Sequence, residues 1–231
     1  MRAGIAEFDL LQRTSLADLR PRLRYSYVAL HQRKYVAESS VGMRVERRLA
    51  TPGWQIFGDG ELGYEDYSNT RDVPFAAEQE GRYIQAKSGA YYVVSRSLRL
   101  MGALRYRDKD ADKRYEDYQL WGVEGSLVQV FENNTYLSFD ASLDWQRYGQ
   151  ADPFISTTKD RTDKDWIFNV TYGIPLLQAI TVFDSDATMP EGWDDLDLTL
   201  TGGYQRQESN IPNFSYNNWR AQVLVTKRWN F

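Results

Sequence analysis

The chain lacks cysteine altogether and has a single histidine, His31, among its 231 residues. The absence of cysteine excludes disulfide bonds, thiolate metal sites and cysteine nucleophiles. Most sites that cleave or transfer lipids and peptides use a histidine base. His31 falls on the apolar side of an alternating segment, with no serine and aspartate gathered around it. We therefore expect no enzyme, no cofactor and no metal site.

Two further absences narrow the class of protein. No run approaches the roughly 20 apolar residues of a transmembrane helix. The net charge of −4 gives no basic surface for nucleic acid. The opening "MRAGIAEFDLLQ" lacks the basic-then-apolar pattern of a secretory signal. An exported protein of this sequence would therefore have lost its signal or be a fragment of something longer.

Period-two alternation of apolar and polar residues is the main feature that the sequence does have. In "TYLSFDASLDWQ", Leu137, Phe139 and Leu143 share one face, and Ser138 and Asp140 share the other. This period is the primary signal of a β-strand with two different faces. Ten such segments follow one another from residue 21 onward, several of them a dozen residues long. The sequence therefore predicts an all-β fold.

The links between the segments alternate in length. Short turns, such as that at 51–53, alternate with long polar loops, such as those at 108–114 and 149–164, although 177–194 is long where a turn is due. This asymmetry, with aromatic residues at the ends of the apolar faces, is typical of barrels that span an outer membrane. A soluble barrel or sandwich is the alternative. The predicted aromatic girdle is Trp54, Tyr64, Trp145, Trp166, Tyr172 and Trp219.

The polar faces carry charges of both signs, which a barrel would enclose. Segments 55–65 and 136–146 are acidic, whereas 98–107 is basic, so we expect its arginines to pair across the interior with Asp140 and Asp144. Buried charges persist only when they are paired. The interior is either a salt-bridge network that fills a narrow lumen or a wet polar pathway. The predicted network is Arg44, Glu46, Asp59, Glu61, Lys87, Arg99, Arg105, Arg107, Glu124, Asp140, Asp144, Asp197, Arg220 and Arg228.

The last strand carries the clearest resemblance to a known family. Phe231, Trp229, Val225 and Val223 lie on one face, and Lys227 interrupts them. The chain resembles bacterial outer-membrane β-barrel proteins, which usually end in phenylalanine with an aromatic residue two positions earlier. The resemblance implies that these four residues form the membrane-insertion signal read by the barrel-assembly machinery. The stretch "GGYQRQESNIPNFSYNNW" also resembles the last hairpin of barrels fused behind tetratricopeptide repeats, which serve in polysaccharide or protein export.

Together these features predict a closed antiparallel transmembrane β-barrel of about ten strands, with eight to twelve possible, formed by residues 21–231 of a Gram-negative protein. Residues 1–20 are a periplasmic lead-in, a plug or an extra strand. We expect a narrow, porin-like channel or the membrane component of an export or envelope complex. A sealed anchor that docks a periplasmic partner is the alternative, and a lipid- or peptide-modifying enzyme is a weaker one. The expected contacts are outer-membrane lipid, lipopolysaccharide and a periplasmic or export-complex protein.

Overall fold

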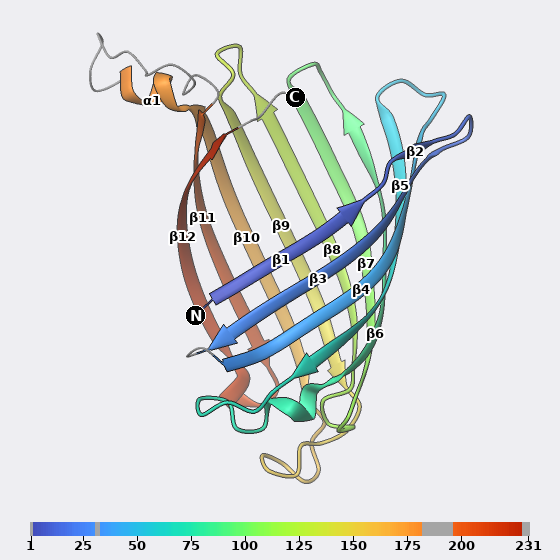
Figure 1. Cartoon of the computed structure of the whole chain (residues 1–231), viewed down its shortest axis with the longest axis vertical. Helices are drawn as coiled ribbons and strands as arrows, with labels where there is room; N and C mark the ends of the chain where they lie inside the picture. The colour runs from blue at the N-terminus through green and yellow to red at the C-terminus, as the bar shows by residue number, and fades with distance from the viewer. Residues whose placement is uncertain (1, 31–32, 182–195, 228–231) are drawn as a thin grey trace.

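The computed structural model describes residues 2–30, 33–181 and 196–227, and these residues form one antiparallel sheet of twelve strands (Figure 1). The all-β prediction is therefore confirmed, and the number of strands is at the upper end of the expected range. The strands are β1 (Arg2–Asp9), β2 (Gln12–Arg13), β3 (Asp18–Leu30), β4 (Arg33–Arg48), β5 (Trp54–Tyr67), β6 (Gly81–Val93), β7 (Leu98–Ala111), β8 (Tyr118–Val130), β9 (Tyr136–Tyr148), β10 (Thr162–Pro175), β11 (Leu196–Ser209) and β12 (Tyr216–Lys227).

The ten strands β3 to β12 correspond to the ten alternating segments of the sequence. The two additional strands come from residues 1–20: β1 pairs with β3 over eight residues, and the short β2 forms a hairpin with the start of β3. β3 itself begins at Asp18, three residues before the boundary expected from the sequence. Strand β7 also continues to Ala111, so Asp108 and Asp110 lie in a strand where a loop was expected.

The sheet curls strongly while keeping sequence neighbours side by side. Its order is β1, β3, β4 and so on to β12, and in Figure 1 the strands β1, β3 and β4 cross in front of β8 to β10. The described residues leave two free edges, on β1 and on β12. Every neighbouring pair is antiparallel, and ten pairings separate β1 from β12, so these two edge strands run in the same direction.

The two ends of the sheet differ, as the links in the sequence predict. Short turns lie at the upper end in Figure 1, where Gly53 and Asn134 have φ angles of +83° and +62°. Glycine and asparagine tolerate this left-handed conformation, which tight hairpin turns require. The long loops lie at the lower end with the 3₁₀ helices η1 (Ala76–Gln79) and η2 (Pro212–Phe214). The helix α1 (Leu176–Thr181) follows β10 at the short-turn end.

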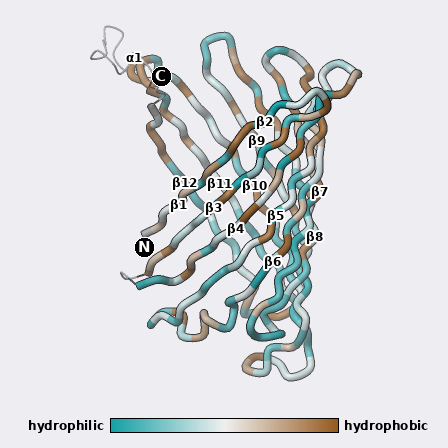
Figure 2. The backbone as a smooth tube through the Cα atoms, turned by 45° about the vertical axis from the view of Figure 1, so that its right-hand side comes forward, coloured by the Kyte–Doolittle hydropathy of each residue, from teal (hydrophilic) through white to brown (hydrophobic). Residues whose placement is uncertain are grey.

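The sheet has an exposed apolar face and a less exposed charged face. Leu104, Trp121 and Val223 are all more than 60% exposed on the apolar face, whereas Glu61 and Asp144 on the other face are nearly buried. Figure 2 shows the same alternation of apolar and polar residues along the strands. This is the reverse of a water-soluble fold, which buries its apolar face. Among the described residues, no helix has the length and apolar character needed to cross a membrane.

Candidate functional site

The charged face of the sheet is the candidate functional site. Register aligns Arg44 on β4, Asp59 on β5, Lys87 on β6 and Arg105 on β7 in one row across the sheet. Side chains at matching positions on an antiparallel sheet point to the same face. The strand pairing therefore gathers into one row charges that are up to about sixty positions apart in the sequence.

Most ion pairs on this face skip a strand. Arg22 on β3 reaches over β4 to Asp59 and Glu61 on β5, with guanidinium–carboxylate distances of 3.2 and 2.7 Å. Lys87 on β6 pairs with Glu124 on β8 in the same way. Strands two apart are separated by nearly 10 Å in a flat sheet. Long side chains can close that distance where the sheet curls toward them, so the charged face lies on the inside of the curl.

Glycine lies beneath several of these bridges, on the strand that is skipped. Arg105 on β7 pairs with Asp144 on β9 across Gly122 of β8, where an added Cβ would lie 2.0 Å from Asp144 Oδ1. Tyr83 on β6 reaches Glu38 on β4 across Gly63 of β5. Each glycine leaves the space in which the crossing side chain lies. The same arrangement recurs at Gly42, Gly173 and Gly203.

Several predicted residues have partners other than those expected. Arg107 pairs with Glu65 instead of Asp140, because it lies nearer the long-loop end of β7. Arg99 lies 3.9 Å from the centre of the Tyr91 ring and forms a cation–π contact. Asp140 accepts a hydrogen bond of 2.8 Å from Ser138. The expected pairing of the three arginines of 98–107 with Asp140 and Asp144 therefore applies to one pair, Arg105 with Asp144.

The remaining predicted charges are placed as follows. Arg44 Nε lies 2.5 Å from Glu46 Oε1, and Arg220 donates a hydrogen bond of 2.7 Å to Asn169. Asp197 lies on β11 opposite Pro175. Arg228 and His31 are outside the described residues.

Several members of the network are absent from the predicted list, among them Arg22, Lys109 and Tyr83. Arg22 and Lys109 each bind a carboxylate, and the Tyr83 hydroxyl donates to Glu38 and Glu61 at 2.5 and 2.8 Å. Arg22 lies on β3 two residues before Arg24, on the same polar face. The alternation of apolar and polar residues could therefore have identified Arg22. Lys109 lies where a loop was expected. Tyr83 has an aromatic ring on the polar face, which no hydrophobic pattern predicts.

The inside of the curl holds several buried side chains near the long loops. Tyr83 and Lys109 are 3% and 4% exposed, and Tyr148 is also buried. Arg161 stacks between Tyr148 and Phe214, at 4.3 and 3.6 Å from the ring centres. In the adjoining loop, burial raises the pKa of Glu116, and the nearby positive charge of Arg161 partly offsets that shift. Charged and aromatic side chains thus pack together at this end of the charged face.

The predicted girdle residues lie on the apolar face near the strand ends. Trp54 is near the short turns, whereas Tyr64, Trp145, Trp166 and Trp219 are near the long loops. Tyr172 lies toward the short-turn end of β10. Ring contacts add further aromatics to the same zones, including Tyr92 at 4.8 Å from Trp54 and Tyr204 at 4.5 Å from Trp219.

The predicted insertion signal is only partly within the described residues. Val223 and Val225 lie on β12 opposite Leu200 and Leu198 of β11 and are exposed on the apolar face. Trp229 and Phe231 are outside the described residues.

The chemistry available on the charged face is ion pairing and hydrogen bonding. Among the described residues, no three potential metal ligands from His, Cys, Asp and Glu are grouped closely enough to hold an ion. The arginines, lysines and carboxylates present charges of both signs along the inside of the curl. Such a surface suits the binding or passage of charged solutes.

Comparison with known proteins identifies the family. No curated protein matches the chain. Residues 76–226 match the model of a family described as a protein of unknown function, DUF2860. The match begins at the start of η1 and ends one residue before the end of β12. This match covers well over half of the sequence, and the chain therefore belongs to the DUF2860 family.

Proposed function

We propose that the protein is a β-barrel of the bacterial outer membrane and acts as a narrow channel or as the membrane component of an export or envelope complex. The observation that carries this proposal is the reversal of the two faces, with exposed apolar side chains outside and paired charges inside. In water an apolar surface of this extent would drive aggregation. In a bilayer it is the surface that lipid stabilises. The long loops then face outward and the short turns face the periplasm.

Closure of the sheet is part of the proposal, because a free strand edge in lipid leaves backbone groups without hydrogen bonds. The free edges belong to β1 and β12, which run in the same direction, so the seam between them is parallel. A parallel ladder is slightly less stable per residue than an antiparallel one. β1 has eight residues, slightly fewer than the 9–11 usual for a transmembrane strand. The seam is therefore the weakest pairing of the barrel.

Disulfide cross-linking tests the seam. The chain has no natural cysteine, so an intramolecular disulfide can form only between the two introduced cysteines. The first cysteine replaces Val223 on β12. The second replaces Ala6 on β1, and further variants place it at other positions of β1 in turn, so that each possible register between the two strands is sampled. We expect cross-links with the β1 series, detected by gel mobility of the folded protein.

The matched control places the second cysteine on β3, starting at Tyr25, which pairs with Ala6 in register. A β3 position is one strand farther from β12 and should not cross-link. Cross-links to β3 would mean instead that β12 displaces β1 and closes an antiparallel barrel of ten strands. Failure of both series would contradict closure.

Conductance in a planar bilayer tests the channel. Tyr83 fills the interior near the long loops, so Tyr83→Ala should widen the passage and raise a small wild-type conductance. The control is Tyr64→Ala, which removes the same side chain from the exposed face of the neighbouring strand. An equal effect of the two substitutions would contradict a pathway past Tyr83. A large, steady wild-type conductance would contradict a narrow lumen.

The filled long-loop end favours a second candidate, a sealed anchor that docks a periplasmic partner. In that case neither the wild type nor Tyr83→Ala conducts ions. The folded protein would still require detergent or lipid and would shift its gel mobility on heating, so the barrel and the channel are tested separately.

A further inference from the structure

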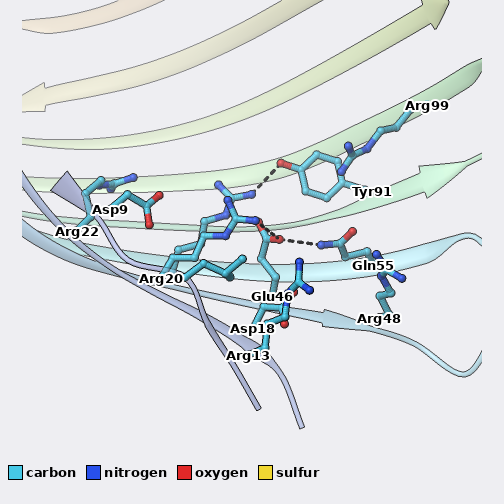
Figure 3. Close-up of a pocket in the computed structure, with 12 residues that line it drawn as sticks. Asp9, Arg13, Asp18, Arg20, Arg22, Glu46, Arg48, Gln55, Tyr91 and Arg99 are labelled. Carbon is cyan, nitrogen blue, oxygen red and sulfur yellow. Dashed lines mark hydrogen bonds and ion pairs between the residues drawn. The ribbon is translucent and has the colours of Figure 1, made fainter. Parts of the chain in front are cut away.

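A cavity of about 520 Å³ opens on the charged face at the short-turn end, opposite the filled end of the interior (Figure 3). Its walls come from the end of β1, the β2–β3 hairpin and the adjoining ends of β4 to β7. Its size is within the range of small-molecule binding sites. The arginines that line it are Arg13, Arg20, Arg22, Arg44, Arg48 and Arg99.

The lining carries more positive than negative charge. Only three carboxylates face these six arginines, those of Asp9, Asp18 and Glu46. Two deeper carboxylates, Asp59 and Glu61, bind Arg22. Even with these two, the six arginines outnumber the five carboxylates, so the cavity lining keeps a net positive charge.

Glu46 holds the inner part of this wall in place. Arg20 and Arg44 lie directly opposite each other on β3 and β4, and both approach Glu46, at 3.9 and 2.5 Å. Gln55 donates a hydrogen bond of 2.8 Å to the same carboxylate. Arg44 also donates to the Tyr91 hydroxyl at 2.8 Å. Two like charges opposite each other destabilise a sheet. Here the two arginines share Glu46, and Arg44 also lies 4.0 Å from Asp59.

Three arginines lie at the opening, and one of them, Arg13, is opposite Asp18 in the β2–β3 register. Arg13, Arg48 and Arg99 form no ion pair with any residue that the structure describes. Arg48 and Arg99 are exposed, and stacking on Tyr91 fixes the position of the Arg99 guanidinium. Deeper in the cavity wall, Arg20 Nε and Arg22 Nε are buried without a hydrogen-bond partner in the described part of the chain. Buried donors are usually satisfied by protein groups, ordered water or a bound ion.

We propose that this cavity binds the phosphate group of a small anionic solute. The planar guanidinium fork matches phosphate oxygens in two-point hydrogen bonds, and several arginines converge on one space. The exposed arginines attract the anion, and the inner pair Arg20 and Arg44 receives it. Binding needs only the cavity, so this inference goes beyond the proposed function and does not depend on conduction.

Titration of the full chain in detergent with inorganic pyrophosphate tests the site. We expect saturable binding that weakens as sodium chloride is raised, because the contacts are ionic. Replacing both Arg48 and Arg99 with glutamine should weaken binding at least about tenfold, as expected for the loss of a charge-assisted hydrogen bond. The fold of the variant is checked by its heat-dependent gel mobility.

The matched control is the double variant Arg47→Gln, Arg96→Gln, which removes the same charge at the same end from residues that do not line the cavity. It should bind pyrophosphate as the wild type does. An equal loss in both double variants, or no saturable binding to the wild type, would overturn the proposal. Displacement of pyrophosphate by a short-chain anionic phospholipid would support the phosphate site and assign it to a lipid headgroup; no displacement would assign it to a free solute.

Discussion

Replacing Leu104 with arginine is expected to cost about 2–4 kcal/mol of folding free energy in a lipid bilayer, the cost of an arginine on the lipid face at the membrane midplane. Leu104 is at the middle of β7 and is 61% exposed on the apolar face. If that face met water, an arginine there would be nearly neutral, as most surface substitutions are. The substitution therefore distinguishes lipid from water around the sheet. Equilibrium unfolding in vesicles measures the difference.

Leu16→Arg is the matched control, because it makes the same change at an equally exposed leucine. Leu16 is 72% exposed. It lies in the hairpin that links β2 to β3, outside the strands that carry the apolar face. We expect its effect to stay within about 0.5 kcal/mol. Similar small effects at both positions, or a folded and monodisperse protein in plain buffer, would contradict the membrane proposal.

Replacing Asp144 with alanine is expected to destabilise the protein by about 3 kcal/mol, the lower end of the range for breaking a buried ion pair. Asp144 is 6% exposed in its side chain and Arg105 is 31% exposed, so water partly screens the charge that remains. Its loss leaves Arg105 without a carboxylate inside the curl. In a closed barrel the same change should admit water and favour the passage of anions over cations.

The control for this prediction is Asp140→Ala, two residues earlier on the same strand. Asp140 faces the same interior but accepts its described hydrogen bond from Ser138 instead of an arginine, so its loss should cost much less. In the double variant Asp144→Ala, Arg105→Met, most of the lost stability should return, because no unpaired charge remains. Equal costs at positions 140 and 144 would show that the ion pair contributes little and that the interior is open to water.

The sequence alone determined the ten strands β3 to β12 and their two faces. Alternation with period two is local, so a segment such as 136–148 specifies its own faces whatever lies beside it. The turn residues Gly53 and Asn134 likewise specify short links by their own backbone preferences. The candidate interior charges followed from the same alternation.

Only the tertiary structure decided which charges meet. A pair such as Arg107 and Glu65 depends on the register of β5, β6 and β7 together and on the curl that brings alternate strands within reach. The same holds for β1, which has a weak amphipathic pattern and is held by hydrogen bonds to β3. The sequence does contain one local indication of these ion pairs and hydrogen bonds between alternate strands. It is the presence of glycines on the polar face, such as Gly122 and Gly63. Their role becomes visible only when a side chain of a neighbouring strand lies over them. The sequence alone does not show which residue fills the space that a glycine leaves.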